Sequence, residues 1–205
     1  MSAHNANARL EMFCDGVIAI AITLLIIEIK VPHVAEIHSV NELWHELAHM
    51  WPSWFAFLLG FGTILIAWVN HHSFMKYLNK TSNRFIYATG FFLLTIVILP
   101  FTTALMAEYM QTPYAQPAIV IYCWCSLLHN IGWLAIFNVA KKMHLVKDDK
   151  SMKKLEEGLN YCKYGFGLYL LVCILSFWFP LVALAGMTLS LFAWLIIGIV
   201  FGKDE

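Results

Sequence analysis

Two histidines and a glutamate near residue 45 have the spacing of a metal-dependent hydrolase. His45, Glu46 and His49 form the pattern H-E-x-x-H, in which two imidazoles one helical turn apart bind Zn²⁺ and the glutamate acts as a general base. Such an enzyme also needs a third metal ligand and a substrate cleft. The nearby side chains that offer a third ligand are His33, Glu36, His38 and Glu42. We therefore predict no dedicated metal site, with His45 and His49 as weak candidates for incidental zinc binding or pH sensitivity.

The same histidines also fit the polar face of an amphipathic helix over about residues 40–51. Apolar residues recur there at helical spacing: Val40, Leu43, Trp44, Leu47, Met50 and Trp51. The opposite face would carry Glu42, His45, Glu46 and His49. This pattern is typical of a helix that lies on a membrane surface, and it explains the histidine spacing without a metal.

A second residue that could take part in chemistry is Asp15, which lies inside the first long apolar run of the chain. An ionisable side chain within a membrane span costs roughly 2.5–3.5 kcal/mol, so it usually faces other helices and has a partner there. Arg9, His71 and His72 are the candidate partners in a buried network. Two alternatives stay open: Asp15 caps a helix at the membrane surface, or it works with the histidines in proton-coupled transport.

The chain that positions these residues is too apolar for a soluble domain. Of its 205 residues, 60% are hydrophobic and 13% charged, and the mean hydropathy is +0.70. Six segments are long enough to cross a membrane, at about residues 13–29, 54–77, 85–106, 118–139, 164–179 and 182–201. We predict one all-α transmembrane domain over residues 1–205, with a kink at Pro100. The zero net charge gives no basic field for nucleic acid, so no nucleic-acid partner is expected.

The positions of lysine and arginine predict the orientation of these spans. Positive residues accumulate in short cytoplasmic loops. With six crossings, Lys30 alone falls on the outer side, and twelve of the thirteen cationic residues share the other: Arg9, Lys76, Lys80, Arg84, Lys141, Lys142, Lys147, Lys150, Lys153, Lys154, Lys163 and Lys203. We therefore expect both termini in the cytoplasm and a solvated, lysine-rich loop between the fourth and fifth spans.

One face of the first span carries a row of mostly apolar residues. At about 100° per residue, Gly16, Thr23, Leu24 and Ile27 all fall within about 60° of Ile20, whereas Asp15 falls about 140° away. On pattern alone, such a row is typical of packing between helices. The single hydroxyl in it, on Thr23, is its one unusual feature.

The first span resembles that of a known channel family. Arg9, Phe13, Cys14 and Asp15 read R-x-x-x-F-C-D and precede the run G-V-I-A-I-A-I-T-L-L-I-I-E-I. This resembles the R-x-x-x-F-S-D motif and first helix of the bacterial relatives of the lysosomal potassium channel, transmembrane protein 175. Trp68, His71 and His72 in the second span, and Leu99, Pro100 and Phe101 in the third, are also similar to that family. Cys14 replaces the usual serine and is a weaker hydrogen-bond donor.

The resemblance implies a homotetramer whose first helices surround a potassium-permeable pore without a carbonyl-lined filter. By the same resemblance, Ile20, Leu24 and Ile27 narrow the pore and Thr23 contributes to cation selectivity. A network behind the first helix would brace it, formed by Arg9, Phe13, Cys14, Asp15, Trp68, His71 and His72.

From the row of residues and the resemblance together, we predict a potassium-permeable channel of the plasma membrane. Four copies of Ile20 would block ions by dewetting, and Thr23 would replace part of the potassium hydration shell. Membrane lipid and further copies of the chain are the expected partners, potassium is the permeant species, and no cofactor is expected. A proton-coupled secondary transporter and, third, a zinc-dependent membrane protease remain the alternatives.

Overall fold

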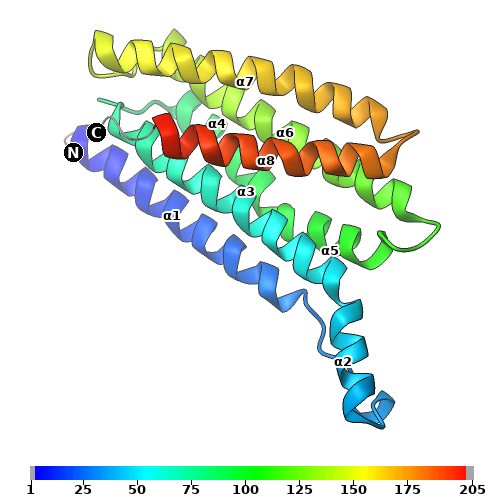
Figure 1. Cartoon of the computed structure of the whole chain (residues 1–205). Coiled ribbons are helices and arrows are strands. Elements are labelled where there is room, and N and C mark those ends of the chain that lie inside the picture. Colours follow the sequence, from blue (N-terminus) through cyan, green and yellow to red (C-terminus); the bar gives the residue numbers. More distant parts are fainter. Residues whose placement is uncertain (1–2, 202–205) are drawn as a thin grey trace.

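The computed structural model describes residues 3–201, and every regular element in that range is helical. Both the first residues of α1 and the last residues of α8 lie at one end of an elongated bundle (Figure 1). The elements are α1 Ala3–Ile27, the short η1 Val34–Glu36, α2 Val40–His49, α3 Trp51–Lys76, α4 Asn83–Val97, α5 Leu99–Tyr109, α6 Ala115–Lys142, α7 Asp149–Leu175 and α8 Pro180–Phe201. Lys203, one of the cationic residues from which the orientation was predicted, lies outside the described residues.

The prediction of six membrane-spanning segments is confirmed for the described part of the chain. Six helical stretches are long and apolar enough to cross a membrane, and α4 and α5 form one of them, Asn83–Tyr109. The break between these two helices falls at Ile98. Pro100 lacks the N–H that would bond to the carbonyl of Ile96, which interrupts the helix at the predicted place.

The predicted start of the fifth span is wrong by about fifteen residues. Asp148 caps α7, because its Oδ1 accepts a hydrogen bond of 2.7 Å from the backbone N–H of Ser151, and this bond lowers the pKa of the Asp148 carboxyl. Leu155, Leu159 and Cys162 then recur at helical spacing and are buried. Much of the charged stretch that was expected as a solvated loop is therefore helix, and the connection to α6 is short.

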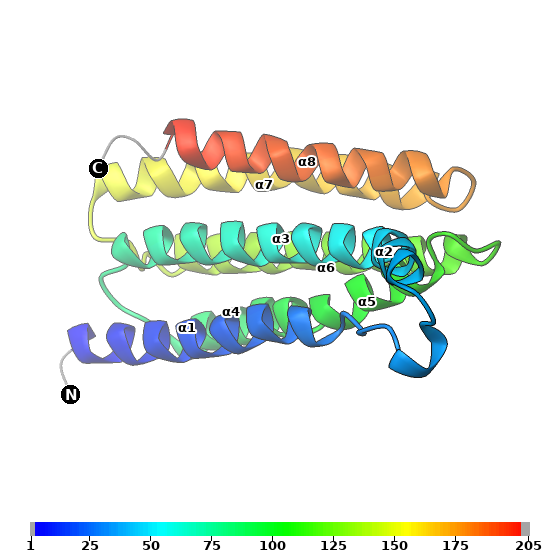
Figure 2. The ribbon, with the colours of Figure 1, turned by 60° about the horizontal axis from the view of Figure 1, so that its bottom comes forward.

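The helices form three layers (Figure 2). One layer contains α1 with α4 and α5, the middle layer contains α3 with α6, and the third contains α7 with α8. Two apolar clusters hold the bundle together. One is centred on Phe85, Phe92 and Ile136, and the other on Met106, Ile119 and Cys123. Because α3 contacts both α1 and α5 on one side and α8 on the other, it links the outer layers.

The loops at the end of the bundle where α1 begins are joined by backbone hydrogen bonds. Leu78 pairs with Val146 in an isolated β-bridge, Asn79 donates to the carbonyl of Leu145 at 2.8 Å, and the N–H of Lys147 donates to Tyr77 at 2.9 Å. This pairing connects the end of α3 to the turn between α6 and α7.

Close approach of α4 and α6 depends on Gly132. A Cβ at this position would lie 3.1 Å from the Cα of Phe92. The approach brings the Phe92 and Trp133 rings into an edge-to-face contact with centroids 4.6 Å apart. A larger residue would push the two helices apart.

We expect Gly132→Val to destabilise the folded protein by about 1–3 kcal/mol, because overpacking a filled core forces backbone shifts of this cost. The measurement is the apparent melting temperature in detergent. Gly167 is the matched control, since a Cβ there meets no atom within 4 Å, and Gly167→Ala should leave the melting temperature unchanged or higher. Equal melting temperatures for Gly132→Val and the parent protein would contradict this account.

Candidate functional site

The row predicted on the first helix is exposed in the single subunit. Ile20 is 63% exposed, Leu24 39% and Ile27 71%, and Thr23 is also exposed. A Cβ added to Gly16 would meet nothing within 4 Å. The opposite face of α1 packs into the bundle through Leu10, Cys14, Ile18, Ala21 and Leu25. The row therefore occupies the face of α1 that its own subunit leaves uncovered.

Within this row, the Thr23 hydroxyl has one fixed partner. Its Oγ1 donates a hydrogen bond of 2.8 Å to the backbone carbonyl of Ile20. A hydroxyl has one donor and two acceptor lone pairs. Since the hydroxyl proton is directed along the helix, the lone pairs of the Thr23 oxygen remain free to accept a contact from a group next to α1. Such an acceptor favours cations over anions.

Two polar contacts join α1 to α3 on the flank of this row. Trp68 Nε1 donates to Asp15 Oδ1 at 2.9 Å, and His72 Nδ1 lies 3.0 Å from Glu11 Oε1. The Trp68 and His72 rings also stack, with centroids 6.0 Å apart. Glu11 and Asp15 are one turn apart on α1, as are Trp68 and His72 on α3, so the two antiparallel helices meet in a two-rung polar ladder.

Asp15 is the thirteenth of the 25 residues of α1. The interpretation of Asp15 as a cap of the first helical turn is therefore wrong, because the helix begins at Ala3, well before the apolar run. The same shift puts Arg9 and Glu11 inside the helix. Glu11 was missed as a site residue, although its position four residues before Asp15 indicated that both carboxylates share a face.

The remaining residues of the predicted bracing network are placed in different surroundings. Cys14 is fully buried, whereas Arg9 and Phe13 are exposed on the single subunit. His71 is buried and stacks on Phe92 with centroids 5.7 Å apart, and neither of its ring nitrogens has a hydrogen-bond partner among the described residues. His72, and not His71, therefore supplies the histidine of the ladder.

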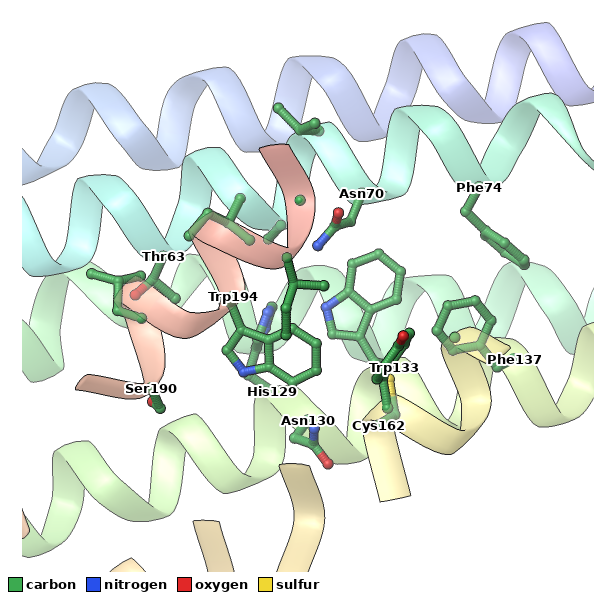
Figure 3. Close-up of a pocket in the computed structure, with 18 of the residues that line it drawn as sticks. Thr63, Asn70, Phe74, His129, Asn130, Trp133, Phe137, Cys162, Ser190 and Trp194 are labelled. Atoms are coloured by element: carbon green, nitrogen blue, oxygen red, sulfur yellow. The ribbon is translucent and has the colours of Figure 1, made fainter. Parts of the chain in front are cut away.

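A cavity in the described part of the chain lies elsewhere, between α3, α6, α7 and α8 (Figure 3). Its volume is about 460 Å³, and Asn70, His129, Asn130, Trp133 and Trp194 are among its lining residues. Asp15, His71 and His72 do not line it. Asp15 and the two adjacent histidines are thus separate from this cavity, and His129 is the histidine that lines it.

The amphipathic segment predicted at residues 40–51 is helical, as α2, Val40–His49, and projects from the end of the bundle opposite to the start of α1 (Figure 1). His45 Nε2 and His49 Nε2 lie 3.3 Å apart. Within the residues that the structure describes, no group of three or more His, Cys, Asp or Glu side chains is arranged to hold a metal ion. The described residues thus assemble no three-ligand zinc centre of the protease type.

Comparison with known proteins places these features in a family. The family model described as the endosomal/lysosomal potassium channel TMEM175 matches residues 9–100, which include both rungs of the ladder and the exposed row. A potassium channel of Chamaesiphon minutus is 37% identical over 172 residues, covering 83% of this chain and 84% of the relative. The human endosomal/lysosomal proton channel TMEM175 is 34% identical over 147 residues, or 66% of this chain and 28% of the human protein.

The fold agrees with these sequence matches. The crystal structure of a lysosomal potassium-selective channel TMEM175 homolog from Chamaesiphon minutus is similar with a TM-score of 0.84 and 33% identity, covering 94% of this chain and 97% of that one. The expected resemblance is thereby confirmed, and the family is one of ion channels and not of enzymes. This six-span chain, with its exposed row on α1, belongs to the TMEM175 family.

Proposed function

We propose that this chain forms a potassium-permeable cation channel, as a homotetramer with α1 of each subunit lining a central pore. The observation that carries the proposal is the exposed row on α1, in which apolar side chains at Ile20, Leu24 and Ile27 accompany the Thr23 hydroxyl. In a pore built from four such faces, this row contacts water and ions and does not contact lipid. The names of the bacterial relatives support potassium as the permeant ion.

The charge distribution supports an orientation with both termini in the cytoplasm of a cell whose plasma membrane holds the channel. The paired loops at residues 77–79 and 145–147 belong to the lysine-rich side. The opposite end carries α2 and Trp51 and Trp54, which are partly exposed and suited to a membrane interface. Lipid covers the apolar outer faces of the remaining helices.

The gate in this proposal is a ring of four Ile20 side chains, one from each subunit. A narrow apolar ring expels water, and an ion cannot cross it without its hydration shell. Leu24 and Ile27 extend the constriction by one and two turns. Opening then requires the four helices to tilt or rotate apart, which replaces dewetting by a continuous water column.

Selectivity in this proposal arises at Thr23, close to the ring. Its oxygen is held as an acceptor by the bond to the Ile20 carbonyl, so four hydroxyls can replace part of the hydration shell of a cation. Potassium holds its water less tightly than sodium and is favoured. Because the ligands are few and no carbonyl-lined filter takes part, the selectivity is modest.

The polar ladder fixes the rotation of α1 and therefore the direction in which the row faces. Relative to Ile20 at 0°, the buried face lies at about 80–160°, Glu11 and Asp15 at about 180° and 220°, and the row between about 300° and 40°. The other members of the predicted brace are Arg9, Phe13, Cys14 and His71. Arg9 and Phe13, exposed on one subunit, suit contacts with a neighbouring subunit in the tetramer.

Reversal potentials of the purified protein in liposomes or a planar bilayer, under opposed potassium and sodium gradients, test the function. A channel gives downhill potassium current without a coupled ion. A proton channel, as the human relative is named, gives a reversal potential that follows the pH gradient. A bilayer that stays impermeable to ions would overturn the proposal.

We expect Ile20→Asn to raise the potassium flux several-fold, because a polar ring stays wet in the closed state. The measurement is potassium efflux from liposomes. Ile196→Asn is the control, since Ile196 is 60% exposed on α8 and faces away from the proposed pore. An equal or lower flux in well-folded Ile20→Asn protein would count against the gate.

Thr23→Val keeps the shape of the side chain and removes the oxygen. We expect the permeability ratio of potassium to sodium to fall by about two- to tenfold, the factor that corresponds to a lost polar contact of about 0.5–1.5 kcal/mol. Thr23→Ser retains the hydroxyl and should keep most of the selectivity. The measurement is the shift in reversal potential, and an unshifted value for Thr23→Val would remove Thr23 from the selectivity mechanism.

The ladder predicts an energetic coupling between Asp15 and Trp68. In a double-mutant cycle of Asp15→Ala and Trp68→Phe, we expect a coupling of about 0.5–3 kcal/mol, as for residues in direct contact. Thermal unfolding in detergent measures it. Trp124 is the control partner, because it is 43% exposed on α6, and Trp124→Phe should couple to Asp15→Ala by less than about 0.5 kcal/mol. Equal coupling in both cycles would contradict the ladder.

A further inference from the structure

The side chains of His45 and His49 lie against each other on one side of α2. Their Nε2 atoms lie 3.3 Å apart, and the two ring centroids are separated by 4.4 Å with the planes at 62°. Both residues lie on the exposed polar side of a helix in which no residue is buried. The Nε2 atoms of two imidazoles thus lie close together on a side of α2 that is open to solvent.

The separation of the two nitrogens matches the requirement of a tetrahedral metal ion. Zinc binds imidazole nitrogen at about 2.0–2.1 Å, and at a tetrahedral angle two such nitrogens lie about 3.2–3.4 Å from each other. In the metal-free chain the pair lies within reach of a hydrogen bond, and the same separation is the one that two imidazole ligands of a tetrahedral ion have.

Glu46 lies near a second position that metal sites use. Its Oε1 lies 3.9 Å from Nδ1 of His45, the ring nitrogen that faces away from His49. In metal sites, a carboxylate beside that nitrogen holds the proton on Nδ1 and leaves Nε2 free to bind the ion. At 3.9 Å the Glu46 carboxylate is beyond hydrogen-bond distance of Nδ1, so its side chain must move closer before it can orient this ring.

We propose that His45 and His49 bind one divalent transition metal ion of the zinc class, with water in the remaining coordination positions. The open positions follow from the absence, among the described residues, of a third protein ligand at this place. The site is separate from the α1 row and from the ladder. A test of metal binding is therefore independent of the channel proposal.

The consequence of binding is a more rigid α2. This helix has ten residues, and its interactions are local: Ser39 caps it by accepting a hydrogen bond of 3.1 Å from the backbone of Glu42. A helix of this length without buried residues is marginal in water. An ion that bridges positions four residues apart binds the helical form and not the frayed one, so it stabilises the helix by mass action.

The test is a titration of the purified full-length chain in detergent with Zn²⁺ alone, followed by calorimetry. We expect saturable binding of about one ion per subunit. In the double variant His45→Ala with His49→Ala, the affinity should fall by at least about tenfold, the lower end of the loss seen even for outer partners of a metal site. Amide hydrogen exchange across Val40–His49 should slow with Zn²⁺ in the parent protein and not in this variant.

Two further variants separate a built site from histidine content. Leu47→His with His49→Ala keeps the number of histidines but places the second one two positions from His45, on another side of the helix, and should bind as weakly as the double alanine variant. His33→Ala with His38→Ala removes other histidines of the same segment and should bind within about twofold of the parent. The proposal is overturned if the double alanine variant, or Leu47→His with His49→Ala, binds Zn²⁺ as tightly as the parent protein. It is also overturned if only His33→Ala with His38→Ala loses binding. Zinc binding without slower exchange in α2 overturns the proposed rigidity.

Discussion

The structure depends on the need to pair a carboxylate that lies inside an apolar helix. Asp15 cannot face lipid without a large cost, and it is satisfied by the indole N–H of Trp68 on the neighbouring helix. The Glu11 to His72 contact one turn away repeats the arrangement. Together with the apolar face that α1 buries in the bundle, the two contacts set the rotation of α1. The face with Ile20 and Thr23 is then turned away from the bundle as a geometric consequence.

The spans were predictable because hydropathy and length are properties of single segments. The beginnings of α1 and α7 were not, since both helices continue beyond the apolar run into residues that resemble a loop in composition. At Asp148 the start is decided by one capping bond, and at Leu155 and Leu159 by burial against α6, which local composition does not reveal. The kink at Pro100 was predictable because its cause is local.

The exposed row was predictable from helical periodicity, and its partner contacts were predictable only in part. Trp68 and Asp15 were both expected in one network, and they are bonded. Which of the adjacent residues His71 and His72 reaches α1 depends on the rotation of α3, which sequence spacing leaves open. Glu11 was missed because the span was taken to begin at Phe13. The tetramer and the role of Thr23 are proposals that rest on the family and on the exposed face, since no pattern in one chain specifies how many copies assemble.

The ladder also constrains how the protein is made. Trp68 is separated from Asp15 by 53 positions in sequence, so during synthesis the first helix is complete long before its hydrogen-bond donor exists. Release of α1 into lipid at that stage would expose an unpaired carboxylate to hydrocarbon. Until α3 is made, the apolar remainder of α1 alone offsets the cost of this carboxylate, and the bond to Trp68 can form only after α3 has been added.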